Sequence, residues 1–216
     1  CRAYAAQARA RLDKRLADWV NQIRRKARTG VHGPVEFVAL DHYLHEMRLY
    51  KSSGEAALMR HAARITAAAH ARLMQNCRPG MHEYELEAEF IHECATRGAR
   101  FQAYPPIVGG GGNACVLHYV DNRDELADGD LVLVDAGCEY GYYASDITRT
   151  FPVNGRFSPA QRAVYELVLA AQEAAIAKAR PGNHWNDPHD AAVRTITKGL
   201  VDLGLLKGAV AKLIKD

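Results

Sequence analysis

The stretch between residues 131 and 146 constrains the fold of this 216-residue chain more than any other segment. Four apolar residues in a row, Leu131 to Val134, are typical of a buried strand, and they lead directly into Asp135. Gly141 then marks a turn before Asp146. With a loop made of Tyr140 and Gly141, the two aspartates would face each other across an antiparallel hairpin, with Cβ atoms about 5 Å apart. The sequence therefore predicts two carboxylates on one face of a sheet.

Two carboxylates so close together beside an apolar strand need a compensating partner. Their mutual repulsion would raise the pKa of one of them unless a cation neutralises the pair. A pair of divalent metal ions uses such carboxylates as chelating and bridging ligands. A dyad that shares a proton, or two separately solvated aspartates, would also account for the spacing. The spacing alone leaves these three interpretations open.

The rest of the chain predicts helices on both sides of this strand block, which is typical of an α+β domain. Helical periodicity, capping residues and Gly or Pro stops delimit the helices, and a shift towards a period of two marks the strands. The predicted helices are a basic amphipathic one within the first thirty residues, then 52–77, 82–97, 158–180, 187–204 and the start of one in 209–216. The predicted strands are 35–40, 101–108, 115–120, 131–137 and 142–153.

Composition narrows the class of protein. The net charge of +3 is too close to neutrality to favour nucleic acid as a partner, and the basic first helix is interpreted as having a solvated face. No apolar run approaches the roughly 20 residues that a membrane span needs. Five cysteines without C-x-x-C spacing predict reduced thiols and a cytoplasmic location. The start, Cys1-Arg2-Ala3-Tyr4, lacks the features of a secretory signal, so we expect the sequence to begin inside a longer protein.

A family resemblance rests on motifs spread over most of the chain. The most specific is the segment 134–137 followed by 145–152, which resembles the paired-aspartate signature of the pita-bread metallopeptidases, and within them aminopeptidase P and the related prolidases. Further segments match in order and spacing: Ile107-Val108-Gly109-Gly110, Asn113, Leu117-His118-Tyr119, Asp128-Gly129-Asp130, Phe157 to Arg162, and Arg180-Pro181-Gly182. The segment from His45 to Ser52 resembles the link between the family's two domains.

The resemblance implies a site as well as a fold. It implies that two divalent metal ions, most often Mn²⁺ with Zn²⁺ or Co²⁺ as alternatives, share a hydroxide that attacks the peptide bond in front of a proline. Asp135 would serve one metal and Asp146 would bridge both. His118 would contact the substrate near the scissile bond and polarise its carbonyl, and Tyr104 would line the substrate pocket, with core packing as the alternative for Tyr104. The substrates would be peptides with proline at the second position, and the parent protein would be a homo-oligomer.

The chain also departs from the family pattern. The family's later ligands, one His and two Glu, have no match after residue 152, so the resemblance covers an aminopeptidase P truncated at both ends. Residues 1–45 would be the tail of the N-terminal domain and 46–216 the first part of the pita-bread domain. Because two carboxylates cannot supply the roughly six donors that each hard divalent cation prefers, we expect the chain alone to be an inactive fragment.

Two alternative functions are compatible with the resemblance. A prolidase, which acts on Xaa-Pro dipeptides, would use the same chemistry. A catalytically inactive pita-bread relative would act as a binding module, but retention of Asp135, Asp146 and His118 argues against it.

Overall fold

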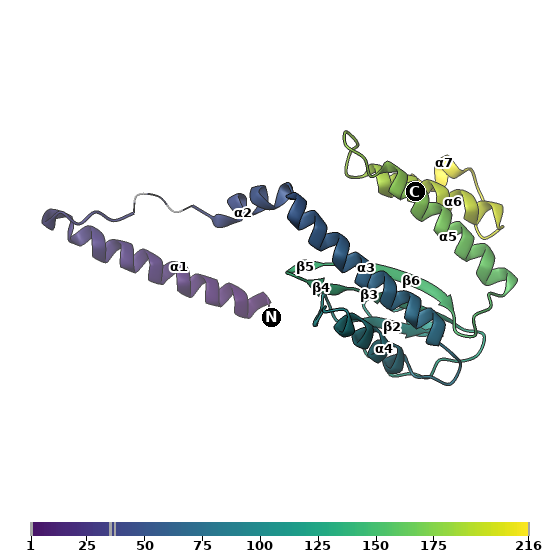
Figure 1. Cartoon of the computed structure of the whole chain (residues 1–216). Coiled ribbons are helices and arrows are strands. Elements are labelled where there is room, and N and C mark those ends of the chain that lie inside the picture. The colour runs from purple at the N-terminus through teal and green to yellow at the C-terminus, as the bar shows by residue number, and fades with distance from the viewer. Residues whose placement is uncertain (1, 35, 37, 216) are drawn as a thin grey trace. The chain divides into compact units, whose positions relative to one another are not determined.

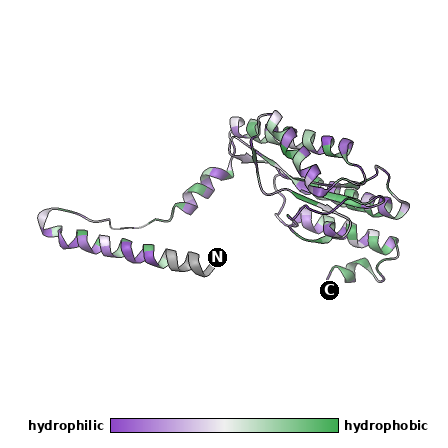
Figure 2. Ribbon diagram, turned by 90° about the horizontal axis from the view of Figure 1, so that it is seen from below, coloured by the Kyte–Doolittle hydropathy of each residue, from purple (hydrophilic) through white to green (hydrophobic). Residues whose placement is uncertain are grey.

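The computed structural model describes residues 2–34, 36 and 38–215, and it divides into two compact units, residues 1–52 and 53–216. The first unit consists of α1 (Arg2–Arg25), the short 3₁₀ helix η1 (Ala27–Thr29) and α2 (Leu40–Leu49). The predicted basic helix is therefore present as α1. In Figure 2 its described part is mostly hydrophilic, with short hydrophobic patches. This pattern agrees with a helix whose basic residues are solvated.

The strand predicted over residues 35–40 is not found where the structure describes this segment. Val35 and Phe37 lie outside the described residues, residues 36, 38 and 39 have no regular structure, and Leu40 is the first residue of α2. Leu40, Leu44 and Met47 recur at helical spacing. This helical pattern, and not the short apolar run that predicted a strand, determines the structure at Leu40.

The second unit contains two small antiparallel sheets that are covered by helices (Figure 1). The first sheet has the order β2-β3-β6 and the second the order β1-β4-β5. Their strands are β1 (Phe101–Gln102), β2 (Ile107–Gly110), β3 (Leu131–Ala136), β4 (Cys138–Tyr140), β5 (Tyr143–Ala144) and β6 (Ile147–Pro152). Helices α3 (Ser53–Asn76) and α4 (Glu83–Thr96) precede them in the sequence and pack together.

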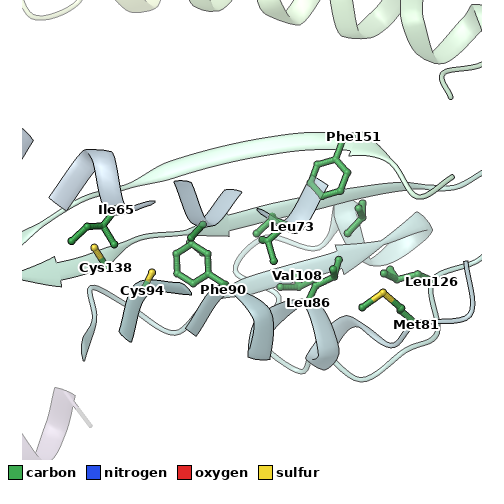
Figure 3. Close-up of a cluster of buried hydrophobic side chains, with 14 of the residues drawn as sticks. Ile65, Leu73, Met81, Leu86, Phe90, Cys94, Val108, Leu126, Cys138 and Phe151 are labelled. Carbon is green, nitrogen blue, oxygen red and sulfur yellow. The ribbon is translucent and has the colours of Figure 1, made fainter. Parts of the chain in front are cut away.

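The core lies between these two helices and one face of the first sheet (Figure 3). Leu73 of α3 and Leu86 and Phe90 of α4 are fully buried there. In β3 burial alternates strictly: Val132, Val134 and Ala136 face the core, whereas the residues between them are only partly buried. Because successive side chains of a strand point to opposite faces, Asp135 lies on the face away from α3 and α4.

Three predicted strands differ from the observed ones. The strand expected over 101–108 is split into β1 and β2 around Pro105 and Pro106, which cannot donate hydrogen bonds to a sheet. The strand expected over 115–120 is wrong, since Cys115 ends the 3₁₀ helix η2 (Gly111–Cys115) and residues 116–120 follow it as a loop. The strand expected over 142–153 is interrupted at residues 145–146, between β5 and β6.

The hairpin register also differs from the prediction. The two-residue loop consists of Gly141 and Tyr142, with φ of 59° and 68°, because Tyr140 pairs with Tyr143. Positive φ at both loop residues matches the twist of the flanking strands, which explains why the turn forms one residue later than expected. Asp135 consequently pairs with Thr148, and the predicted direct pairing of Asp135 with Asp146 is wrong.

The last helices are α5 (Pro159–Lys178), α6 (Asp187–Asp202) and the short α7 (Val210–Leu213), with α5 and α6 packed side by side. Ser158 caps α5 as predicted: Gln161 N donates to Ser158 Oγ, and Ser158 N donates to the Gln161 side chain. None of the helices in the described part of the chain combines the length and apolar character that crossing a membrane requires.

Candidate active site

Asp135 and Asp146 lie where the chain passes from one sheet to the other. Asp135 is the penultimate residue of β3, and Asp146 stands immediately before β6, the neighbouring strand. Asp135 pairs with Thr148, and Asp146 lies two residues before Thr148 in the same extended segment. Residues two apart on a strand share a face, so both carboxylates reach the same side of the sheet despite the shifted register.

Gly137 permits this close approach of the two chain segments. Its carbonyl accepts a hydrogen bond from Ala103 N at 2.9 Å, next to the point where β3 gives way to β4. A Cβ atom at this position would lie 1.8 Å from the carbonyl oxygen of Ser145, which is backbone and cannot rotate away. Gly137, two residues after Asp135, therefore allows the segment that carries Asp146 to lie against it.

The Tyr104 hydroxyl joins the two carboxylates. Its oxygen lies 2.6 Å from Asp135 Oδ1 and 3.0 Å from Asp146 Oδ1. A phenol carries one proton, which it can donate to only one of these oxygens at a time. Burial, and then the hydrogen bonds to Asp135 and Asp146, raise the pKa of Tyr104, so the hydroxyl stays protonated at neutral pH.

A hollow of about 310 Å³ brings together all four residues that the sequence singled out. Tyr104, His118, Asp135 and Asp146 line it, together with Pro105, Ile107 and Val120. His118 reaches it from a loop, with a left-handed backbone (φ 55°), and not from the predicted strand. A second hollow of about 240 Å³ shares His118 and Asp135 with the first. An imidazole, a phenol and two carboxylates therefore meet beside a space large enough for a small peptide segment.

The oxygen donors at this hollow fit part of a site for hard divalent cations. Carboxylate oxygens are the ligands that such ions prefer, and Asp135 and Asp146 are close enough to share one partner, the Tyr104 hydroxyl. Among the described residues, however, no group of three or more His, Cys, Asp or Glu side chains is arranged to hold a metal ion. The two aspartates thus form half of a metal site at most.

His61, His70 and Cys138 have packing roles. His70 of α3 is buried under β3, and its Nε2 lies 3.1 Å from Ala136 O. Burial lowers the pKa of His70, which favours the neutral ring. The His61 ring packs edge-on against Tyr140, and Cys138 is fully buried, beyond the reach of a peptide.

Sequence reasoning missed one functional candidate, Glu83. It is the first residue of α4 and is fully buried, and its carboxylate accepts hydrogen bonds from the loop that carries His118. In the sequence it is one of several glutamates at the start of a helix, where acidic residues are common. Only its burial distinguishes it from them.

Two aspartates on one face of a sheet, beside a hollow that also receives an imidazole and a phenol, are compatible with a hydrolase that depends on divalent metal ions. The chain belongs to metallopeptidase family M24, whose profile matches residues 57–212. The Xaa-Pro aminopeptidase of Escherichia coli is 49% identical over 195 residues, which are 90% of this chain and 44% of that protein.

Solved structures agree with this assignment and with the pita-bread fold. Aminopeptidase PepP of Pseudomonas aeruginosa superposes with a TM-score of 0.91 at 58% identity, over 95% of this chain and 47% of that one. Zinc-substituted E. coli aminopeptidase P in complex with product superposes with a TM-score of 0.88 at 49% identity, over 91% of this chain and 44% of that one. The chain thus spans somewhat less than half the length of these relatives.

Proposed function

We propose that the protein to which this chain belongs is a metal-dependent aminopeptidase that releases an N-terminal residue preceding proline. The observation that carries the proposal is the meeting of Asp135, Asp146, Tyr104 and His118 at one hollow. Membership of a metallopeptidase family and similarity to Xaa-Pro aminopeptidases support it. The same proposal takes peptides with proline at the second position as substrates, and a cytoplasmic homo-oligomer as the form of the enzyme.

In this proposal Asp135 and Asp146 would both hold the divalent metal ions, with Mn²⁺ as the metal and Zn²⁺ or Co²⁺ as alternatives. When bound, such ions activate water as a nucleophile near neutral pH and polarise the carbonyl of the substrate. The remaining ligands would come from sequence outside these 216 residues, because two carboxylates supply too few donors for two ions.

The protein side chains orient the substrate and stabilise developing charge. His118 lines the hollow beside Asp135, where an imidazole N–H can donate to the substrate carbonyl oxygen as negative charge develops on it. Tyr104, whose pKa is raised, remains a hydrogen-bond donor to the carboxylates at neutral pH and keeps them together. Ile107, Val120 and Pro105 give the hollow an apolar lining that suits a prolyl ring.

The test is hydrolysis of an Xaa-Pro-Xaa tripeptide and of an Xaa-Pro dipeptide by the full-length protein, with Mn²⁺ added and then removed by a chelator. We expect cleavage of the tripeptide that stops on chelation. The isosteric change Asp146→Asn, which removes one ligand charge, should lower activity at least about 100-fold, since loss of a supporting partner alone can weaken a metal site that much.

The matched control is Asp202→Asn, the same change at an exposed position at the end of α6, which should leave activity unchanged. Cleavage of the dipeptide alone would assign prolidase activity instead. Tight metal binding without cleavage of either substrate would indicate a binding module, and cleavage that resists chelation would contradict the metal mechanism.

A further inference from the structure

Glu83 is a fully buried carboxylate at the first position of α4. Its Oε1 accepts hydrogen bonds from Gly110 N at 2.8 Å and Asn113 Nδ2 at 3.0 Å. Its Oε2 accepts from the Tyr119 hydroxyl at 2.8 Å and Asp124 N at 3.0 Å. One side chain therefore satisfies four donors that are far from it in the sequence.

Hydrogen-bond donors surround the Glu83 side chain. Within the described residues, no Lys or Arg forms an ion pair with it. Instead, all four contacts are donors, and the positive end of the α4 dipole is adjacent to the side chain. A buried carboxyl group is tolerated only when its oxygens are satisfied in this way, so the burial of Glu83 depends on the four contacts.

The four donors belong to residues 110–124, which begin at the last residue of β2, include η2 and are called the 110–124 loop below. Gly110 and Asp124 are its two ends, and Asn113 and Tyr119 lie between them. The backbone of Glu83 adds a further bond, from its N–H to Asp124 O at 2.9 Å. Glu83 thus closes the loop at its base and also holds its middle.

This loop carries His118, the neighbour of Tyr119. His118 has a left-handed backbone, and in the described part of the chain no hydrogen bond or ion pair fixes its side chain. Its position at the hollow beside Asp135 and Asp146 therefore depends on the conformation of the loop. A left-handed conformation costs a non-glycine residue free energy and persists only where the surroundings impose it.

We infer that Glu83 is the positioning residue of the active site: its carboxylate holds the 110–124 loop closed and thereby places His118 at the hollow. The effect on catalysis rests on the proposed aminopeptidase function, whereas the effect on the loop does not. Glu83 itself touches neither metal nor substrate, since its carboxylate is fully enclosed by the loop and α4.

The sharpest variant is Glu83→Gln, which keeps the shape of the side chain. The amide group replaces one accepting oxygen by a donor. Whichever way the amide turns, a backbone N–H, that of Gly110 or that of Asp124, faces another N–H. The matched control is Glu85→Gln, two residues along the same helix. The exposed Glu85 side chain accepts from His82 N at 2.7 Å and lies 3.7 Å from His82 Nδ1, and a glutamine can keep the hydrogen bond to His82 N.

The first readout is hydrogen–deuterium exchange of the full-length protein, measured on peptides. In Glu83→Gln we expect exchange at least about 10-fold faster in residues 110–124, because local opening frees these amides, with α3 unchanged. Glu85→Gln should match the wild type throughout. This readout needs no activity, so it separates a failure of the inference from a failure of the proposed function. Unchanged exchange in the loop would overturn the inference.

The second readout is a double-mutant cycle with His118→Ala. Glu83→Gln should lower kcat on the order of 100-fold, the cost of a misplacement of about 1 Å, while metal content stays at the wild-type level. In the His118→Ala background the same change should lower kcat less than about 3-fold, because two residues that act through one group are not additive. Equal losses in both backgrounds would overturn the inference.

If Glu83→Gln does not fold, Tyr119→Phe, which removes one of the four contacts, is expected to give a smaller effect with the same pattern.

Discussion

At the scale of single residues, the Tyr104 hydroxyl stabilises the close approach of the Asp135 and Asp146 carboxylates in the described chain. It touches one oxygen of Asp135 and one of Asp146 and donates its proton to either. Hydrogen bonds to charged groups stabilise a protein more than neutral ones, and here the bond also offsets the repulsion between two like charges. The residue that was expected to line the substrate pocket therefore also organises the proposed metal ligands.

Tyr104→Phe tests this role of the hydroxyl. Without metal, the free energy of unfolding should fall by about 2 kcal/mol, the usual contribution of a hydrogen bond to a charged group. The measurement is urea denaturation in the presence of a chelator. Tyr142→Phe is the control, because Tyr142 is 96% exposed and its loss should change stability by less than about 0.5 kcal/mol. Equal stabilities of the Tyr104 variant and the wild type would contradict the role.

At the scale of elements, the junctions between strands bring Asp135 and Asp146 together more than the strands themselves do. The chain leaves one sheet for the other at Gly137, between β3 and β4, and returns between β5 and β6 at residues 145–146. These two interruptions lie against each other, since Ser145 N donates to Cys138 O at 2.9 Å. The hydroxyl of Thr66 on α3 lies 2.6 Å from Ser145 Oγ and accepts from Cys138 N, which ties the junction to the core.

Gly137→Ala should disrupt this junction. The added Cβ would lie 1.8 Å from Ser145 O, so one of two paired backbone segments must move. We expect a loss of about 3 kcal/mol in the free energy of unfolding, at the upper end of what overpacking costs.

The measurement for Gly137→Ala is again urea denaturation, and Mn²⁺ affinity should fall with stability because Asp135 and Asp146 flank the junction. Gly112→Ala is the matched control, since a Cβ there meets no atom within 4 Å. A Gly137 variant as stable as this control would show that the junction can relax, against our expectation.

At the scale of the whole molecule, the described chain carries the two proposed metal ligands on a sheet whose other face is the core. The two aspartates share their hollow with His118, but within the described residues no third His, Cys, Asp or Glu joins them as a ligand group. A site with so few donors holds hard cations poorly, because Mn²⁺-like ions prefer about six.

The 216-residue chain alone should therefore bind Mn²⁺ at least about 100-fold more weakly than the full-length protein, since losing even a second-shell partner can weaken a metal site 10- to 100-fold. It should also leave an Xaa-Pro-Xaa tripeptide intact. Calorimetric titration of both proteins with Mn²⁺ measures the difference, with Asp135→Asn in each as the control for site-specific binding. Equal affinities would mean that the chain supplies a complete site.

Much of the secondary structure could be predicted because its signals are local. The Ser158 cap of α5, the helical period of α3 and the apolar run of β3 each lie within a few residues of what they specify. Where two local signals competed, as at Leu40, the helical period prevailed over a short apolar run. The predicted position of the hairpin loop was wrong for a related reason. The loop position depends on which residues adopt a positive φ, and in this chain Tyr142 does so next to Gly141.

The sequence by itself indicated two aspartates on one face of an antiparallel sheet, and its motifs indicated the metallopeptidase family that the profile match confirmed. Only the tertiary structure decided that Asp135 pairs with Thr148, that Tyr104 joins the two carboxylates, and that Glu83 closes the loop of His118. These features rest on contacts between residues far apart in the chain. Such contacts leave no periodic trace in the sequence, because their geometry arises only when separate elements pack against one another.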